Sequence, residues 1–257
     1  MNYKVHPTAI IDPSAVIGEG CEIGPYCIIG PKVILGKNNL LLSHVIVNGP
    51  TTLGDGNKIS SFAVIGTDPQ DLKYNGEDTF LEIGNNNTIR ESVTINRSNG
   101  PHEPTRVGDN NLLMAYAHIA HNCQIGNYIV IANSVNFAGH VTVGDFAILG
   151  GLTAIHQFVK IGAYSFIGGC SAVKKDIPPY VRGQGNPFEI HGLNGVGLLR
   201  KGFSSETVMG IKRVYKLFYR KGLNTTQAIE EAEKMDLTPE QKLFVEFVKN
   251  GDRGLTK

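Results

Sequence analysis

An apolar residue recurs at every sixth position along most of the chain. Steps of six from Val5 to Val173 meet Ile, Leu, Val or Phe, and only Asp71, Glu77 and Pro101 interrupt this phase. A period of six differs from the 3.6 of a helix and from the 2 of an open sheet. Each hexad therefore predicts a short strand and a turn, with the aliphatic side chain pointing into the axis of a parallel β-helix.

Two further positions of the hexad fit this interpretation. Small or β-branched residues stand two places before the aliphatic residue, and we expect the cysteines found there, Cys21, Cys27 and Cys123, to be core fillers. Glycine often follows the aliphatic residue, as at Gly18 and Gly24, where we predict a turn that needs freedom in φ. If three hexads form one triangular coil, residues 18 apart stack in columns about 4.8 Å apart.

The hexad phase is broken twice and then stops. Polar segments near 67–80 and 97–106 are predicted to loop out of the coil. A loop extruded from a regular solenoid is usually a binding element, although an insertion that is merely tolerated has the same sequence pattern. After the DIPPY sequence the pattern turns helical from about Asn186, with Ser204 and Thr238 as helix caps. We predict a β-helical domain over 1–185 and a small α-helical domain over 186–257.

Composition excludes several classes of protein. The 257 residues are 41% apolar with a net charge of +1, which indicates a folded, soluble chain and argues against broad nucleic-acid binding. No apolar run suits a membrane span, and the N-terminus lacks the apolar region of a signal peptide, so we expect the cytosol. Basic residues gather between 200 and 221 against the single acid Glu206. They suit an acidic partner or nucleotide phosphates, or simply form a solvated helix face.

The candidate chemistry lies off the apolar column, between residues 118 and 157. Column arithmetic places His121, Gly139 and Gln157 in one outward column, with Asn122 and His140 in the next. A glycine above a histidine leaves a gap and an accessible backbone N–H, which suits a general base beside an oxyanion donor. The histidines of this stretch are His118, His121, His140 and His156.

Other interpretations of these histidines stay open at this point. They could be ordinary solvated residues of a non-catalytic scaffold, or three of them could bind zinc, as in a β-helical metal hydratase. Nucleophilic cysteine chemistry has little support, because Cys123 falls on the inward position of its hexad. No phosphate-binding loop or dinucleotide fingerprint occurs.

With these motifs in hand, the chain resembles the UDP-N-acetylglucosamine 3-O-acyltransferases of lipid A biosynthesis, which are hexapeptide-repeat acyltransferases. The resemblance covers essentially the whole chain and rests most specifically on QDLKY, HIAH and IHQF in that order. It implies a left-handed parallel β-helix followed by a small α-helical domain, assembled as a homotrimer with active sites between subunits. It also implies transfer of an (R)-3-hydroxyacyl group from acyl carrier protein to the glucosamine 3-position of the UDP-sugar, with no cofactor and no metal.

The resemblance implies roles for the residues that match its motifs. His121 resembles the catalytic base, and the N–H of Gly139 resembles the oxyanion donor, in a direct transfer without an acyl-enzyme. Gly169 stands where side-chain size limits the acyl groove, so we expect a longer acyl chain. Substrate-contacting positions are matched by Gln70, Asp71, Lys73, His118, His140, His156 and Gln157, and nucleotide-contacting positions by Asn194, Arg200 and Lys201.

Three positions depart from the family pattern. The residue after the base is usually Asp, and here it is Asn122. Its amide can orient the ring by accepting from a ring N–H, but it cannot stabilise an imidazolium by charge. Asn96 replaces a frequent His, and Val196 replaces a frequent Glu near the nucleotide position. These departures leave a 3-amino sugar, which gives an amide product, as an alternative acceptor.

Overall fold

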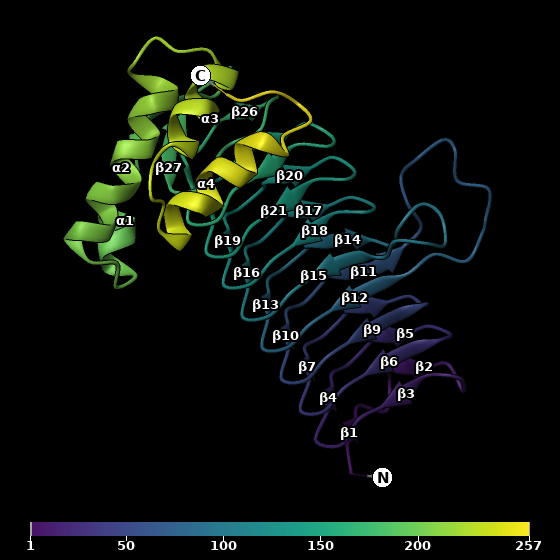
Figure 1. Ribbon diagram of the computed structural model, residues 1–257. Coiled ribbons are helices and arrows are strands. Elements are labelled where there is room, and N and C mark those ends of the chain that lie inside the picture. Colours follow the sequence, from purple (N-terminus) through teal and green to yellow (C-terminus); the bar gives the residue numbers. More distant parts are fainter. Residues whose placement is uncertain (1, 257) are drawn as a thin grey trace.

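The computed structural model describes residues 2–256, and within them three sheets wind around a common axis (Figure 1). Each coil adds one short strand to each sheet, and the strands of successive coils pair in parallel. Ile119, for example, pairs with Phe137, 18 residues further along. The prediction of a parallel β-helix built from hexads is confirmed.

The strands are grouped by sheet, in the order in which they are hydrogen-bonded. The first sheet contains β1 (Lys4–Val5), β4 (Glu22–Ile23), β7 (Leu40–Leu41), β10 (Lys58–Ile59), β13 (Thr88–Ile89), β16 (Leu112–Leu113), β19 (Val130–Ile131), β22 (Ile148–Leu149), β25 (Phe166–Ile167), β27 (Val181–Gln184) and β28 (Glu189–Leu193). The second contains β2 (Ile10–Ile11), β5 (Ile28–Ile29), β8 (Ile46–Val47), β11 (Val64–Thr67), β14 (Thr94–Asn96), β17 (His118–Ile119), β20 (Asn136–Phe137), β23 (Ala154–Ile155) and β26 (Ala172–Val173). The third contains β3 (Val16–Ile17), β6 (Val33–Leu35), β9 (Thr51–Leu53), β12 (Leu81–Ile83), β15 (Thr105–Val107), β18 (Gln124–Ile125), β21 (Thr142–Val143) and β24 (Lys160–Ile161).

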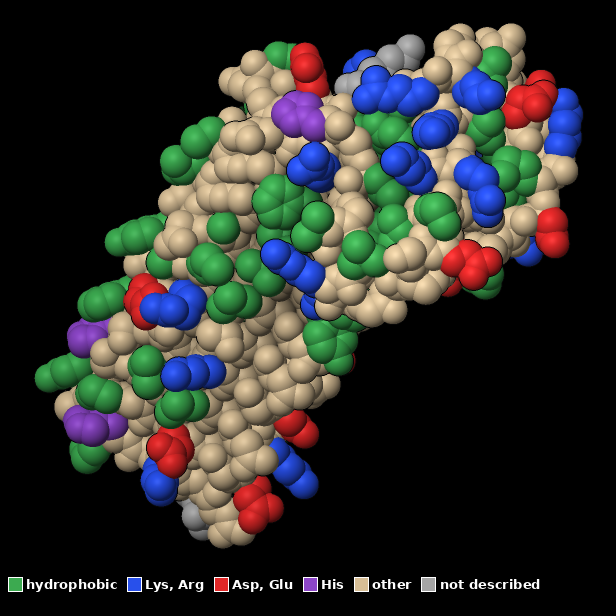
Figure 2. All heavy atoms as spheres, turned by 90° about the vertical axis from the view of Figure 1, so that its left-hand side faces the viewer, with side chains coloured by type: hydrophobic (Ala, Val, Ile, Leu, Met, Phe, Trp, Pro, Cys, Tyr) green, Lys and Arg blue, Asp and Glu red, His purple; other side chains and the backbone are tan. Residues whose placement is uncertain are grey.

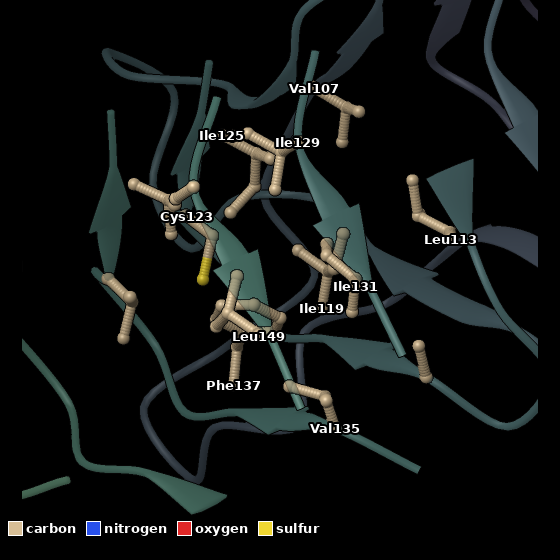
Figure 3. Packing of buried hydrophobic residues seen from close by; sticks show 14 of the residues in the cluster. Val107, Leu113, Ile119, Cys123, Ile125, Ile129, Ile131, Val135, Phe137 and Leu149 are labelled. Carbon is tan, nitrogen blue, oxygen red and sulfur yellow. The ribbon is translucent and has the colours of Figure 1, made fainter. Parts of the chain in front are cut away.

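The interior of the coil is a continuous apolar core. Figure 3 shows side chains from successive coils pointing toward one another, with Ile119, Phe137 and Cys123 among them. The Cys123 thiol is fully buried and donates to the backbone O of Ala138 at 3.2 Å. Cys21 is equally buried, so the prediction that these cysteines fill the core is confirmed.

The glycines that follow the aliphatic residue have another cause than the one predicted. Gly18 does not have a left-handed φ; instead, a Cβ there would lie 2.3 Å from the carbonyl O of Gly36 in the next coil. Left-handed φ falls two places later in the hexad, on residues such as Asn122 (φ 57°) and His140 (φ 61°). The expectation of a φ requirement was therefore wrong for this position. Close stacking of the coils excludes a side chain there.

The coils turn at three edges. The His121 edge, between the second and third sheets, contains residues 120–123, 138–141 and 156–159. The aromatic edge, between the third and first sheets, carries Tyr128 and the rings stacked above it. The third edge lies between the first and second sheets. Both predicted loops leave from the His121 edge (Figure 1): the first loop, 68–80, joins β11 to β12, and the second loop, 97–104, joins β14 to β15.

The β-helix is followed by helices at its C-terminal end (Figure 1). As predicted, Ser204 caps one helix through the N–H of Thr207, and Thr238 forms a capping box with Gln241. The sequence pattern missed β28, an antiparallel strand outside the hexad phase, so residues 186–193 are not helical. The division into two domains stays a prediction. Within 2–256, no helix is long and apolar enough to cross a bilayer. The helices are α1 (Gly195–Arg200), α2 (Ser205–Tyr219), α3 (Thr225–Glu233) and α4 (Pro239–Lys249).

After α4 the chain returns to the β-helix through a tail, residues 250–256. The backbone N–H of Asp176 donates to the O of Gly254 at 3.0 Å, and the N–H of Thr256 donates to the O of Asp176 at 2.9 Å. From the β-helix, Lys160 Nζ donates to the O of Asn250 at 2.7 Å. These contacts fix the tail beside the upper coils.

Candidate active site

The hexad explains the position of His121, but not its burial. His121 stands two residues after the core residue Ile119, so its ring points out of the coil at the His121 edge, as predicted. Its exposed fraction is nevertheless only 8%, because the two loops cover this edge. The imidazole is therefore a buried polar group, and buried polar groups need partners.

The Nδ1 side of the ring contacts the neighbouring amide. His121 Nδ1 lies 3.0 Å from Oδ1 of Asn122. The backbone N–H of Asn122 donates to Oγ1 of Thr105 at 2.8 Å, which ties this turn to β15. The prediction that residue 122 contacts the base is thus consistent with the geometry, with an amide where the family pattern has a carboxylate.

The Nε2 side of the ring faces a carboxylate from the first loop. Oδ2 of Asp71 lies 3.8 Å from His121 Nε2. The backbone N–H of Lys73 and the side chain of Asn99 donate to this carboxyl and hold the pKa of Asp71 below its ordinary value; the nearby His121 acts in the same direction. An ionised carboxylate therefore stands next to the base.

Gly139 lies directly against the ring. A Cβ on this residue would be 2.4 Å from His121 Cε1, so only glycine leaves room for the imidazole. Within residues 2–256, no group accepts a hydrogen bond from the N–H of Gly139. The column arithmetic that paired these two residues is confirmed, and the backbone donor beside the ring is free.

Two further predicted histidines belong to the same cluster. His118 Nδ1 lies 2.7 Å from Oγ1 of Thr94, and the ring of His140 meets that of His121 edge-on, with centroids 5.2 Å apart. Burial lowers the pKa of His118 and of His140, and the neighbouring His121 lowers both further. Both imidazoles are therefore neutral near pH 7 and act as hydrogen-bonding groups rather than as cations.

The upper part of the same edge is exposed and touches the tail. His156 and Gln157 are exposed. The guanidinium of Arg253 contacts His156 Nδ1 and donates from Nε to the O of Gln157 at 3.2 Å. Gln157 therefore continues the column of His121 and His156 stands next to it, with the tail cation Arg253 in contact with both.

The other predicted residues of the first loop diverge from the histidine cluster. Lys73 is exposed. Gln70 lines a separate cavity of about 630 Å³, together with Asn96 and Arg97. Asn96 is buried and donates to Thr67 Oγ1 at 2.8 Å, while its own Oδ1 has no partner within the described part of the chain.

The predicted nucleotide residues lie at a different edge. Asn194 occupies the N-cap position of α1 without a side-chain cap bond, and its Nδ2 donates to the O of Tyr164, a residue of the aromatic edge, at 3.0 Å. Lys201 Nζ lies 5.0 Å from the centroid of the Phe146 ring on the same edge. Arg200 ends α1 and is exposed, as is Val196. Asn194 and Lys201 therefore contact a different edge of the chain from the one that carries His121.

Gly169 lies at the third edge, after β25. A Cβ there would be 3.1 Å from the O of Gly151 in the coil below. The predicted site residues of one chain thus occupy all three edges of the prism, and only those around His121 converge.

A basic face covers part of the helices. Figure 2 shows Lys and Arg side chains gathered over this part of the molecule. Lys212, Lys216 and Arg220 of α2 and its C-terminal end line a hollow of about 350 Å³ together with Arg182 of β27. The exposed Arg213 belongs to the same helix. We call these five residues the basic face.

Several residues of the site were not anticipated from the sequence. Asn99 and Glu103 of the second loop contact Asn122, and Arg253 contacts His156 from the tail. The Asn-Gly pair at 99–100 is a turn signal, but no periodic pattern connects these residues to His121, because loops and tail lie outside the hexad register.

The described side chains also bear on the other interpretations. Within residues 2–256, no three His, Cys, Asp or Glu side chains are grouped as a metal site. Burial raises the pKa of Cys123 to about 12, which disfavours the thiolate that a cysteine nucleophile needs.

Family models and known proteins match the chain along its length. A model described as "Udp N-acetylglucosamine O-acyltransferase; Domain 2" matches residues 176–256, and one described as "Bacterial transferase hexapeptide (six repeats)" matches residues 2–37 and 104–139. The acyl-[acyl-carrier-protein]--UDP-N-acetylglucosamine O-acyltransferase of Psychromonas ingrahamii is 58% identical over 255 residues, which are 98% of this chain and 97% of the relative.

Two further proteins agree with this result. The enzyme of the same name from Gloeothece citriformis is 46% identical over 91% of this chain and 85% of its own. A structure of LpxA from Acinetobacter baumannii superposes with a TM-score of 0.95 at 47% identity, covering 98% of this chain and 99% of that chain. With such identity over nearly its whole length, the chain is an acyltransferase and belongs to the family of acyl-[acyl-carrier-protein]--UDP-N-acetylglucosamine O-acyltransferases.

Proposed function

We propose that the chain transfers an (R)-3-hydroxyacyl group from acyl carrier protein to the 3-hydroxyl of UDP-N-acetylglucosamine, as a step of lipid A biosynthesis. The observation that carries this proposal is the environment of His121: an amide at Nδ1, a carboxylate near Nε2 and an unbonded backbone N–H beside the ring. These are the parts that a general base and an oxyanion site require.

The reaction proceeds by direct transfer. His121 Nε2 takes the proton of the acceptor hydroxyl as its oxygen attacks the thioester carbonyl carbon. The N–H of Gly139 donates to the oxyanion of the tetrahedral intermediate. Collapse of that intermediate breaks the C–S bond, and the carrier thiolate leaves with the proton that His121 holds. A positioned base contributes about 10²–10⁴-fold to the rate, and one oxyanion donor about 3 kcal/mol.

The acceptor and the acyl chain are tested with the purified enzyme and 3-hydroxyacyl carrier proteins of graded length. We expect the 3-hydroxyl sugar to be acylated faster than its 3-amino analogue; the reverse order would replace the ester by an amide product. Absence of transfer to both acceptors would refute the proposed function. We also expect long acyl chains to react best, because Gly169 places no side chain in the groove; a preference for short chains would exclude that role.

We further infer that the working unit is a homotrimer whose sites lie between subunits. The support is the separation of His121, at one edge, from Arg200 and Lys201, at another. A symmetric ring of subunits can bring different edges of neighbouring chains together. The cytosol stays the predicted compartment.

Mixed trimers test the shared site. Co-expression of His121→Ala with the double variant Arg200→Ala/Lys201→Ala pairs two defective chains. If each site uses one edge from each of two subunits, random mixing restores about a quarter of the wild-type activity. If all residues act within one chain, the mixture is as inactive as the separate variants.

A further inference from the structure

The amide of Asn122 is locked in one orientation by groups whose hydrogen-bonding roles are fixed. Its Oδ1 accepts from the backbone N–H of Asn99 at 2.8 Å, and its Nδ2 donates to the backbone O of Glu103 at 3.0 Å and of Asn99 at 3.3 Å. A backbone N–H only donates and a carbonyl only accepts, so the amide cannot be turned over without losing these bonds.

This orientation decides which ring nitrogen of His121 carries the proton. The atom facing Nδ1 is Oδ1 of Asn122, at 3.0 Å, and it can only accept. Nδ1 must therefore be the donor, which leaves the lone pair of the neutral ring on Nε2. Nε2 is the atom that faces Asp71, and in the proposed reaction it is the atom that takes the proton of the acceptor hydroxyl.

Asn99 also reaches the other side of the ring. Its side-chain Nδ2 donates to Oδ2 of Asp71 at 2.7 Å, and this is the carboxylate oxygen that lies 3.8 Å from His121 Nε2. One residue of the second loop thus holds the orienting amide through its backbone and the carboxylate of the first loop through its side chain. The carboxylate missing at position 122 has a counterpart here, on the Nε2 side.

We propose that Asn99 is a positioning residue for the proposed acyl transfer, and this inference rests on that function. Its backbone keeps Asn122 turned so that His121 bears its proton on Nδ1. Its side chain holds the carboxylate of Asp71 and stops it from closing onto Nε2, while the carboxylate stays near enough to stabilise the imidazolium that forms during the reaction. Asn122 is accordingly required as an amide in this chain.

The first test is the effect of a carboxylate at position 122. Asn122→Asp would place an oxygen against the carbonyls of Glu103 and Asn99 and would free the second loop, so we expect kcat to fall at least about tenfold. Asn38 has the same left-handed backbone (φ 56°), is exposed, and lies in a coil far from His121, so it is the matched control; we expect Asn38→Asp to leave kcat unchanged. An Asn122→Asp enzyme as active as wild type would overturn the proposal.

The second test separates the side chain of Asn99 from its backbone. Asn99→Ala keeps the bonds to Asn122 and releases Asp71, which can then pair with His121 Nε2. We expect kcat/KM at pH 7 to fall about fivefold and its acid limb to move to higher pH, since the pair favours the imidazolium. The other titratable groups around the ring are His118, His140 and Glu103, and none of them is altered. An unmoved acid limb would reject the role of the side chain.

A spectroscopic test needs no substrate. ¹⁵N NMR of the imidazoles above pH 8 distinguishes the two neutral tautomers. We expect His121 to carry its proton on Nδ1 in the wild type and to lose this preference in Asn122→Ala, with Asn38→Ala as the control. A proton on Nε2 in the wild type would contradict the proposal. If the wild type transfers no acyl group but shows the Nδ1–H tautomer, the proposed function fails and the orientation of the ring stands. If the wild type is active and Asn122→Asp and Asn99→Ala have its kcat and its pH profile, the proposed function stands and only the positioning role of Asn99 fails.

Discussion

The His121 edge and the aromatic edge have the same backbone conformation but carry different kinds of side chain. Asn122 (φ 57°) and Tyr128 (φ 56°) occupy the same place in successive hexads. From Tyr128 upward, rings stack: its centroid lies 4.9 Å from that of Phe146, and Phe146 lies 4.7 Å from Tyr164. At the His121 edge the same place holds Asn122 and then His140. Two loops cover this edge at the level of His121. The repeat fixes where side chains stand, whereas side-chain type and inserted loops decide what they do.

Truncating one residue at each edge tests whether the two edges differ in function, and we expect the largest effect from this experiment. We expect His121→Ala to lower kcat by about 10²–10⁴-fold with the assembly intact. Tyr128→Ala should leave kcat unchanged and lower the free energy of unfolding by about 1 kcal/mol, since a stacked ring is lost. Steady-state kinetics and denaturant unfolding of both variants measure this. A comparable loss of kcat in Tyr128→Ala would show that the aromatic edge also takes part in the chemical step.

A smaller effect is expected from filling the gap beside the base. The methyl group of Gly139→Ala would displace the ring of His121, and a misplacement of about 1 Å can cost about 10²-fold in rate. Gly30→Ala, at the same edge in a distant coil, is the control, because its Cβ would have no neighbour nearer than 3.3 Å. If Gly139→Ala kept full activity, the close contact between the two residues would have no catalytic meaning.

The helices that follow the aromatic edge carry the basic face, which we expect to affect the binding of acyl carrier protein rather than the chemical step. We predict that Lys212→Glu/Arg213→Glu/Lys216→Glu raises KM for acyl carrier protein about tenfold and KM for the sugar nucleotide much less, because opposite charges steer association. Lys4→Glu/Lys37→Glu/Lys58→Glu, a triple reversal of exposed residues on the β-helix, controls for the change in net charge. Equal changes in the two KM values would exclude carrier docking at the basic face.

The smallest expected effect is on the pH dependence of the free energy of unfolding, through the buried histidines of the His121 edge. Burial lowers the pKa of His118 and His140 in the folded chain. As the pH falls through the ordinary histidine pKa of about 6.5, the unfolded chain binds protons first, so the free energy of unfolding decreases from pH 7 toward pH 5. Urea unfolding at several pH values should show a flatter dependence in His118→Gln/His140→Gln. If the free energy of unfolding of both proteins depended on pH with the same slope, His118 and His140 would not be its cause.

The sequence predicted the scaffold and the core of the site for a physical reason. Hexads relate residues 18 apart by strand pairing, so the contact between His121 and Gly139 follows from counting. The same rule misassigned glycines such as Gly18, since a sequence pattern shows that a side chain is excluded without showing whether φ or a neighbouring coil excludes it.

Other parts of the site could not be predicted, because they lie outside the register. The burial of His121 comes from loops whose paths no periodicity describes, and the bonds of Asn99 to two segments depend on those paths. The separation of Asn194 from His121 likewise follows from the triangular cross-section: the resemblance placed both in one site, and within a single chain they stand at different edges.

The helices are joined to the β-helix twice, once through β28 and again through the tail that pairs with Asp176. A rigid body attached at two separate points lacks the single hinge on which domains open and close. We therefore expect the helices to act as a fixed support and not as a lid. A molecule docked on the basic face would then stay at a constant distance from the coils. The docked molecule itself, and not a movement of the helices, would have to span the distance to His121.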